Sequence, residues 1–270
     1  MGTHTSPQAP PDKDQDSNSP TSPKFSYTAH GLRHSVGITD AGVAYTWGRT
    51  NALGQLGRTT TDRSSVKTPT RVDIKSAKAV KAFVGGSSDS GHTAILDSHG
   101  TLWMAGCDRW QQLGLGSAKG GSSGYTWQDG KLWQEQFLAT PHLTEFLNEN
   151  GTKSLRDVAL GGDHTLVLSS NQRDVYAFGK GGDGQLGLVG KPFVSGFVRS
   201  TVLSSSSREK QKIAAICAVK ACSMTMDEYG NILDKAGKCR SNTKEMVDGL
   251  ESCLARAEQT GLLKRVDKET

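Results

Sequence analysis

The sequence has no hydrophobic run long enough to cross a membrane. Its longest apolar stretches, such as residues 213–219, fall far below the roughly 20 residues that a spanning helix needs. It also has no run of Lys and Arg, and its net charge of +5 over 270 residues is mild. Because nucleic-acid binding depends on concentrated positive charge, we expect nucleic acid not to be the primary ligand.

Cysteine is present in an odd number, and no two of the five residues form a Cys-x-x-Cys pair: Cys107, Cys217, Cys222, Cys239 and Cys253. This predicts isolated thiols in a reducing compartment. The first 24 residues hold five of the eight prolines and no Arg, and they fit neither a secretory nor a mitochondrial presequence. We therefore expect a cytoplasmic or cytosol-continuous location, such as the cytoskeleton or a cilium, with the nucleus as an alternative.

Motifs of catalysis and of metal binding are also missing. There is no nucleophile elbow, no paired-carboxylate motif and no zinc-ligand spacing. Residues 179–184 fit the Gly-x-Gly-x-x-Gly pattern of dinucleotide sites, but the stretch that follows contains Gly and Pro instead of helix formers. We expect no catalytic, metal or cofactor site, and hence a protein that is not an enzyme.

One pattern returns four times along the chain. Its anchor is a His followed by Ser or Thr in three copies and Cys-Ser in the fourth, at His34, His92, His164 and Cys222, which are 58, 72 and 58 residues apart. After each anchor, two stretches of apolar/polar alternation flank a turn, which predicts a pair of antiparallel strands. A repeat period of this size is typical of a propeller or a solenoid.

We expect structural roles for the residues that recur. Histidines that belong to successive units cannot gather around one metal ion, so each is expected to make a buried hydrogen bond. The other recurring positions are a Trp-Gly or an equivalent Gly at the end of the second strand and a Gln-Leu-Gly turn: Trp47, Gly48, Gln55, Gly57, Gly106, Gln112, Gly114, Gly179, Gln185 and Gly187.

These motifs resemble the regulator of chromosome condensation family of β-propellers. The resemblance rests on YTWGRTNALGQLG, GHTAILDSHGTLWMAG and GGDHTLVLSSNQRDVYAFGKGGDGQLGL, and it covers roughly residues 25–240. Family rings close with seven blades, whereas this chain has three complete units and part of a fourth. The resemblance implies an all-β, partial propeller, whose open blade faces need a cover: a second copy, a partner protein or the chain's own C-terminal helix.

The segments around the repeats differ in composition. Residues 1–24 predict a disordered leader, in which Gly2 and Ser6 satisfy the bare N-myristoylation pattern. Residues 241–270 predict a helix and tail, with a capping box at Asn242 and Glu245 and a stop at Gly261. An apolar stripe follows the helix, at Met246, Val247, Leu250, Cys253, Leu254 and Ala257. It packs on the last blade or docks on a neighbouring subunit through Leu250 and Leu254.

The second repeat spacing is 14 residues longer than the other two, 72 against 58. The extra residues fall at about 117–139, where Asp129-Gly130 predicts a hairpin turn. This insertion is rich in large aromatic side chains, at Tyr125, Trp127, Trp133 and Phe137. They either fold back on the blade or anchor a partner.

The sequence as a whole predicts a non-catalytic scaffold that binds other protein subunits of a larger assembly. The family resemblance implies an alternative, a guanine-nucleotide exchange factor or regulator of a Ran-like small GTPase. An enzyme on a propeller scaffold is a third class.

Overall fold

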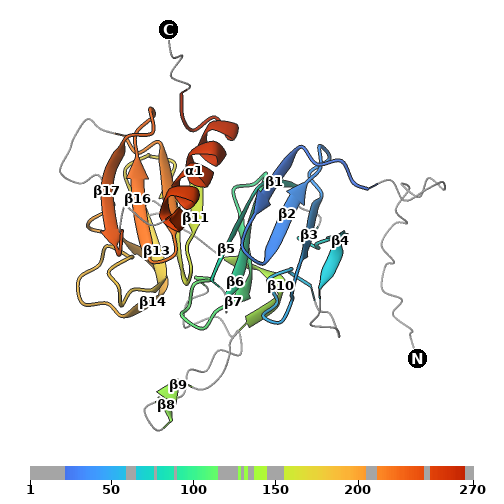
Figure 1. Cartoon of the computed structure of the whole chain (residues 1–270), viewed down its shortest axis with the longest axis horizontal. Helices are drawn as coiled ribbons and strands as arrows, with labels where there is room; N and C mark the ends of the chain where they lie inside the picture. Colours follow the sequence, from blue (N-terminus) through green and yellow to red (C-terminus); the bar gives the residue numbers. More distant parts are fainter. Residues whose placement is uncertain are drawn as a thin grey trace, which may run out of the picture.

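Four antiparallel sheets of three or four strands, which we call the large sheets, and one C-terminal helix form the body of the computed structural model, and a separate two-stranded sheet accompanies them (Figure 1). The structure describes residues 22–58, 65–75, 78–87, 90–114, 127–128, 131–132, 137–144, 155–204, 212–239 and 244–264. Each large sheet contains one copy of the repeat, and we number the large sheets as blades 1 to 4 along the chain. The prediction of an all-β, partial propeller is confirmed.

The blades consist of three or four strands each. Blade 1 consists of β1 (Tyr27–His30), β2 (His34–Ile38), β3 (Ala44–Gly48) and β4 (Val66–Arg71). Blade 2 consists of β5 (Ala79–Gly86), β6 (Gly91–Asp97), β7 (Leu102–Cys107) and β10 (Phe137–Thr144). Blade 3 consists of β11 (Leu155–Leu160), β12 (His164–Ser169), β13 (Val175–Lys180) and β14 (Phe193–Arg199). Blade 4 consists of β15 (Ala215–Val219), β16 (Cys222–Met226) and β17 (Ile232–Gly237).

The two middle strands of each blade are joined by a tight turn with a recurring conformation. The residue that closes this turn has a positive φ in all four blades: Gly42 (79°), Gly100 (74°), Gln172 (62°) and Gly230 (84°). In blade 2, the Asp97 carboxylate accepts hydrogen bonds from the backbone N–H groups of His99 and Thr101, both at 2.9 Å. Such local bonds favour the turn over a continued strand.

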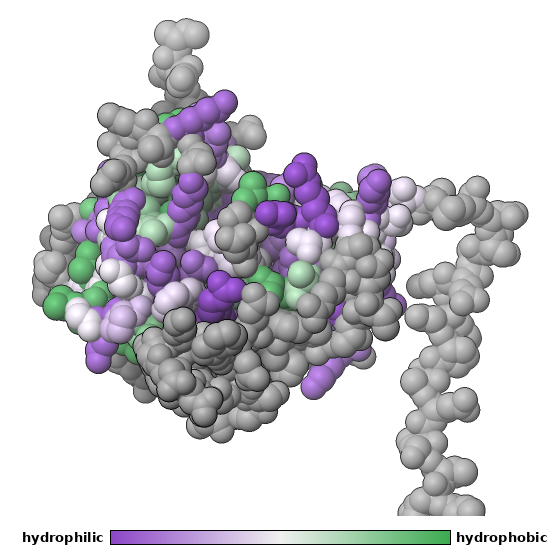
Figure 2. All heavy atoms as spheres, turned by 60° about the horizontal axis from the view of Figure 1, so that its bottom comes forward, coloured by the Kyte–Doolittle hydropathy of each residue, from purple (hydrophilic) through white to green (hydrophobic). Residues whose placement is uncertain are grey.

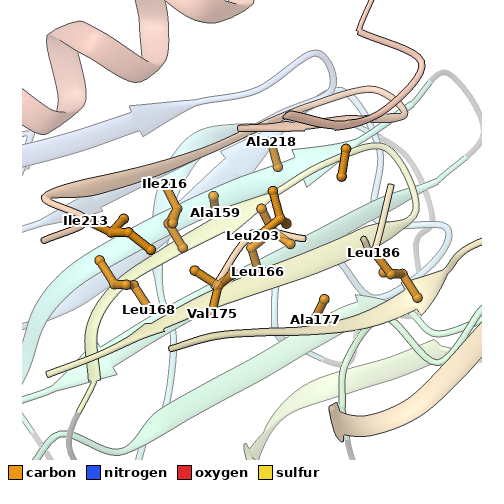
Figure 3. Packing of buried hydrophobic residues seen from close by; sticks show 11 residues of the cluster. Ala159, Leu166, Leu168, Val175, Ala177, Leu186, Leu203, Ile213, Ile216 and Ala218 are labelled. Carbon is orange, nitrogen blue, oxygen red and sulfur yellow. The ribbon is translucent and has the colours of Figure 1, made fainter. Parts of the chain in front are cut away.

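Apolar side chains fill the space between successive blades. Between blades 3 and 4, Leu166, Leu168 and Val175 meet Ile213 and Ile216, and each is at most 1 % exposed (Figure 3). Similar clusters lie between blades 1 and 2 and between blades 2 and 3. Since each blade covers its neighbour, the blades form one continuous body, and burial of these faces stabilises the whole arc.

The helix α1 (Lys244–Gln259) covers the outer face of blade 4, where a further blade would otherwise pack. Ala257 is fully buried against that face, whereas Val247 is 45 % exposed. Gly249 allows the close approach, because a Cβ there would lie 2.5 Å from Cγ1 of Val219. Past the helix, Gly261 has a φ of +68°, as expected of a glycine that ends a helix. Of the three covers considered from the sequence, the chain's own helix therefore covers this end.

The outer face of blade 1 is covered in part by a residue that precedes β1. The ring of Phe25 stacks on Trp47 at a centroid distance of 5.3 Å and meets Tyr45 edge to face at 5.7 Å. It lies over Gly37, where a Cβ would come within 2.6 Å of the ring. A glycine at position 37 is therefore what lets the lead-in segment pack on this face.

Four of the five cysteines are paired, so the prediction of isolated thiols is wrong. Cys217 is bonded to Cys253, Cys222 is bonded to Cys239, and Cys107 is free and buried. The partners are 36 and 17 residues apart in sequence. Neither spacing is a recognisable motif, because the fold brings the pairs together through α1 and the end of β17.

The surface of the described residues is mostly hydrophilic, with separate hydrophobic patches on the face shown in Figure 2. Four of the eight large hydrophobic side chains that are exposed lie on or beside β14: Val189, Phe193, Val198 and Val202. Within the described ranges, no helix is long and apolar enough to cross a membrane. Gly2, Ser6 and the leader up to Thr21 lie outside the described residues.

Candidate functional site

The recurring histidines lie between successive blades, and each is paired with a hydroxyl of the next blade. These hydroxyl residues follow the anchor of the next repeat. His34 Nε2 lies 2.7 Å from Thr93 Oγ1, His92 Nε2 lies 3.4 Å from Thr165 Oγ1, and His164 Nε2 lies 2.8 Å from Ser223 Oγ. We call this set of three contacts the relay.

The direction of each relay bond follows from a second contact of the hydroxyl. Thr93 donates to the carbonyl oxygen of Gln55 at 2.6 Å, Thr165 to that of Gln112 at 2.7 Å, and Ser223 to that of Gln185 at 2.7 Å. Since the single O–H is used in this bond, the hydroxyl oxygen must accept from the imidazole. The histidines therefore carry their proton on Nε2, and the Nδ1 atoms of His92 and His164 have no hydrogen-bond partner.

Burial keeps these histidines neutral. It lowers the pKa of His34 to about 3, that of His92 to about 4 and that of His164 to about 3. All three side chains are at most 3 % exposed. An imidazole that is out of contact with solvent and already donates its proton to a neighbouring blade holds the blades together, and it has no access to a substrate.

The Gln-Leu-Gly turns supply the other half of the relay. The Oε1 atoms of Gln55, Gln112 and Gln185 accept from backbone N–H groups two residues before them, at 2.8 to 3.0 Å. The Leu that follows each Gln is fully buried, and the closing glycines Gly57, Gly114 and Gly187 have φ values of 65°, 67° and 61°. The turn therefore presents its Gln carbonyl to the next blade in a fixed position.

The recurring glycines at the ends of the second strands are needed for close strand contact. A Cβ at Gly48 would lie 2.6 Å from the carbonyl oxygen of Arg33, and one at Gly106 would lie 2.4 Å from that of Gly91. Gly179 meets the carbonyl oxygen of Asp163 in the same way, at 2.6 Å. Residues 179–184 lead into turn hydrogen bonds, from Gly184 N–H to the Gly181 carbonyl at 2.8 Å, and not into a helix.

Blade 4 ends the relay. Cys222 stands where the other blades have the donating His, and its sulfur is bonded to Cys239. The sequence showed a Cys in place of the His, but it did not predict the disulfide. With no imidazole at this position, blade 4 has no donor for a further blade, and α1 packs there instead.

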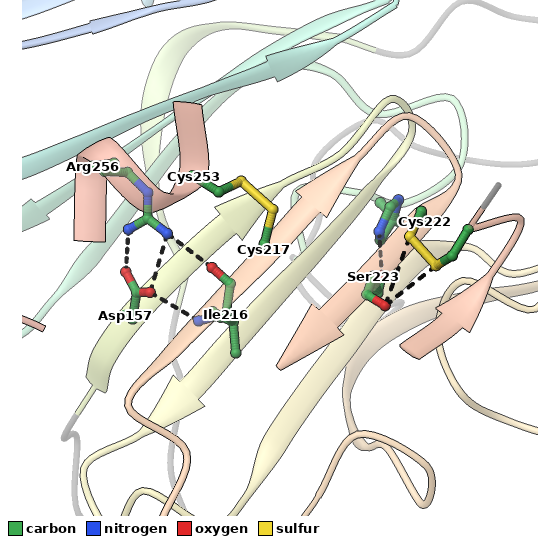
Figure 4. Close-up of a disulfide and its surroundings, with 9 residues drawn as sticks. Asp157, Ile216, Cys217, Cys222, Ser223, Cys253 and Arg256 are labelled. Atoms are coloured by element: carbon green, nitrogen blue, oxygen red, sulfur yellow. Dashed lines mark hydrogen bonds and ion pairs between the residues drawn. A yellow bond between two sulfur atoms is a disulfide. The ribbon is translucent and has the colours of Figure 1, made fainter. Parts of the chain in front are cut away.

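A second polar contact, which the sequence analysis missed, joins the inner strands. The Arg256 guanidinium donates to Asp157 on β11 at 2.5 and 3.2 Å and to the Ile216 carbonyl on β15 at 2.9 Å (Figure 4). It also lies 5.4 Å from the ring centroid of Phe83 on β5. Burial disfavours its charge, but the Asp157 carboxylate outweighs this and the pKa of Arg256 is raised. We call Arg256 and Asp157 the hub.

The predicted insertion leaves blade 2 between β7 and β10. Within it, β8 (Trp127–Gln128) pairs antiparallel with β9 (Lys131–Leu132), on either side of Asp129-Gly130. Tyr125 and Trp133 lie outside the described residues, and the side chain of Trp127 is not described. Phe137 was expected in the insertion, but it begins β10, where its backbone pairs with Cys107 of blade 2.

The two helix residues that were predicted as partner contacts pack inward instead. Leu250 and Leu254 are half-buried against the cluster on blade 4. This packing favours the covering role of the helix, and a contact of these two residues with another subunit stays a prediction. Asn242 lies outside the described residues, and the side chain of Glu245 is not described, so the capping box stays a prediction.

Comparison with known proteins shows which family the repeats resemble. Residues 41–96 and 155–185 match two profiles that are both described as the regulator of chromosome condensation (RCC1) repeat. These two segments are regulator of chromosome condensation repeats. The match to residues 41–96 begins between β2 and β3 of blade 1 and ends within β6 of blade 2, so one sequence repeat contains strands of two successive blades.

Curated relatives are similar to part of this chain and are longer than it. "Protein RCC2 homolog" of Danio rerio is 33 % identical over 179 residues, which are 59 % of this chain and 32 % of that protein. "Protein RCC2" of Homo sapiens is 28 % identical over 167 residues, 59 % of this chain and 30 % of that protein. The match thus spans about a third of the length of these relatives.

Solved structures share the fold. The structure of Prp20p from Saccharomyces cerevisiae superposes with a TM-score of 0.58 and 19 % identity, over 87 % of this chain and 47 % of that one. Human WBSCR16 gives a TM-score of 0.58 and 18 % identity, over 80 % and 48 %. At this identity the likeness supports the propeller fold alone.

Proposed function

We propose that this chain is a non-catalytic protein-interaction scaffold and a subunit of a larger assembly. The observation that carries the proposal is the relay, in which the recurring polar side chains are used between blades. In a repeat protein of this kind, segments that depart from the repeat and project from the body are the natural contact sites. The inserted hairpin is such a segment.

A second surface supports the same role. The segment around β14 exposes Val189 at 92 %, Phe193 at 40 % and Val198 at 42 %. β14 is also the outermost strand of blade 3, so backbone groups on one of its sides are not used within the sheet. Apolar side chains gathered on a sheet edge are a feature of protein contact surfaces.

The alternative function is regulation of nucleotide exchange on a Ran-like small GTPase. It is favoured by the fold likeness to Prp20p, whose structure was reported together with its binding to Gsp1p and histones. Nucleotide-release kinetics separate the two proposals. A scaffold leaves the release of labelled GDP from a Ran-type GTPase unchanged, whereas an exchange factor accelerates it at substoichiometric amounts.

The insertion is tested by replacing Trp127 and Trp133 together with Ala. If the two rings anchor a partner, we expect the fold to be kept and partner affinity to fall by at least about 2 kcal/mol, which is roughly 30-fold. The measurement is quantitative cross-linking mass spectrometry of the native complex, followed by a titration against the partner it identifies.

A matched control is Tyr229→Ala, which removes an exposed ring (56 % exposed) far from the insertion in sequence. We expect it to leave the same affinity unchanged. If the Trp double variant unfolds the protein, the two rings are core and the hairpin is part of the blade. If it binds like the wild type, the contact surface lies elsewhere, and the β14 segment is the next to test.

A further inference from the structure

Both disulfides lie in the last part of the fold, on blade 4 and α1, but they join different pairs of elements. Cys217–Cys253 joins the inner strand β15 to α1, whereas Cys222–Cys239 joins β16 to the residues just after β17 (Figure 4). Only the first of them therefore holds the helix on the blade. The second closes a loop within the blade itself.

In each pair, one cysteine is buried and the other is half-buried. Cys217 and Cys222 are fully buried, and Cys253 and Cys239 are partly accessible. Attack by a thiolate needs a sulfur that it can approach in line with the S–S bond. Of the two residues in the Cys217–Cys253 bond, Cys253 on the helix is the more accessible, so a reductant would meet it first.

We propose that Cys217–Cys253 is a redox-modification site that fastens α1 to the outer face of blade 4 and releases it on reduction by a dithiol. The thiolate of the reductant attacks the Cys253 sulfur, the S–S bond breaks, and Cys217 leaves as a thiolate that takes up a proton. The second thiol of the reductant then attacks the mixed disulfide and frees Cys253. In total, two electrons and two protons pass to the protein, and the reductant becomes a disulfide.

Reduction has a structural consequence because the Cys217–Cys253 bond is a covalent link between the helix and the blade. Isolated helices of about this length, 16 residues, are marginal in water, so α1 depends on what it packs against. Besides the disulfide, its described anchors are the apolar stripe and the Arg256–Asp157 pair near its C-terminal end. Loss of the disulfide removes the covalent anchor one turn before that pair.

The face beneath α1 is apolar, with Cys217, Cys222, Met224 and Met226 at most 3 % exposed. Opening of the helix therefore changes the surface of the protein and not only its stability. In a reducing compartment, disulfides are typically transient and redox-sensing rather than structural. The site stands independently of the proposed scaffold function, since it rests on the pairing of the thiols and on their places in the fold.

The test uses the full chain, purified without reductant and equilibrated in mixtures of reduced and oxidised dithiothreitol, a dithiol, that range from oxidising to strongly reducing. Alkylation of free thiols followed by mass spectrometry measures the reduction of each pair, and hydrogen exchange measures the opening of α1. We expect Cys217–Cys253 to be reduced at the glutathione potential of the cytosol. Residues 244–262 should then exchange from about 30-fold to several hundred-fold faster, as the usual contribution of a disulfide implies, while β12 stays unchanged.

Three variants serve as matched controls. Cys253→Ser should show fast exchange of α1 in every buffer, Cys107→Ser should behave like the wild type, and Cys239→Ser should leave the exchange of α1 sensitive to reductant. The proposal is overturned if Cys217–Cys253 stays oxidised at cytosolic potential, or if its reduction leaves the exchange of α1 unchanged. Both readouts are available on the wild-type chain if a variant does not fold.

Discussion

Replacing Arg256 with Met is expected to lower the free energy of unfolding by about 3–5 kcal/mol. Asp157 is completely buried, and the two hydrogen bonds from Arg256 compensate its charge. Without the guanidinium, an unpaired carboxylate remains in the interior, and the Ile216 carbonyl also loses a donor. Chemical denaturation of both proteins, followed by circular dichroism, measures the difference.

The double variant Arg256→Met with Asp157→Leu is the decisive control for this loss. Because it removes both charges, we expect it to recover most of the stability that the single variant loses. Lys264→Met removes a cation with a surface partner, Glu228, and should leave the stability close to that of the wild type, because water screens such exposed pairs. If Arg256→Met is as stable as the wild type, the hub does not hold the inner strands together.

Acidification from pH 6.5 to pH 5 is expected to lower the free energy of unfolding by about 3 kcal/mol. The relay histidines have folded-state pKa values of about 3 to 4, whereas in the unfolded chain their pKa is near 6.5. Below pH 6.5, the unfolded chain therefore binds up to three more protons than the folded one. Each proton lowers stability by about 1.4 kcal/mol per pH unit.

One carboxyl opposes this trend. Burial raises the pKa of Asp108 to about 7, so between roughly pH 4 and 7 the folded state holds one proton that the unfolded state has released. A neutral Asp108 fits the repeat, because the equivalent residue of blade 1 is Asn51, which carries no charge. The side chains of Asn51 and Asp108 each accept a hydrogen bond from the backbone N–H five residues further on, at 2.9 Å. The net difference is about two protons.

Urea unfolding at a series of pH values measures how the free energy of unfolding changes with pH. Two variants of His164 show how much of that change this residue causes. His164→Gln keeps an N–H donor for Ser223 but cannot titrate. The difference in bound protons between the unfolded and the folded chain should therefore fall by about one. His164→Ala should in addition cost about 1–3 kcal/mol at pH 7, because Ser223 loses its donor. If the free energy of unfolding stays constant down to pH 4.5, the claim that the relay histidines are buried and neutral is contradicted.

The sequence was sufficient for the elements of this fold because they depend on local patterns. The alternation after each anchor and the turn glycines determine the strand pairs, and the Gln-Leu-Gly motif marks the turn that follows them. The contacts between blades are not local. His34 and Thr93 are 59 residues apart, and Asp157 and Arg256 are 99 apart. The one local indication was Asp157, which stands directly before the three apolar residues at the end of β11. A carboxylate in that place indicates that the fold supplies a positively charged partner.

The same reason limits what the sequence says about the functional residues. The pattern at Leu250 and Leu254 is typical both of an exposed docking stripe and of a capping helix, and their packing on blade 4 favours the second. Cys222 appeared as a degenerate His, because a disulfide to Cys239 depends on where the chain turns after β17. Phe137 was counted with the insertion because the start of β10 has no turn signal before it.

The central claim is that the chain covers its own outermost blade faces, with α1 over blade 4 and Phe25 over part of blade 1. Sedimentation velocity of the isolated chain in oxidising buffer tests it most directly. The account predicts a single species with the mass of one chain and a frictional ratio typical of a folded body with short tails. A dimer or larger oligomer that dissociates only when the protein unfolds would contradict it, since the blade faces would then need a second copy as their cover.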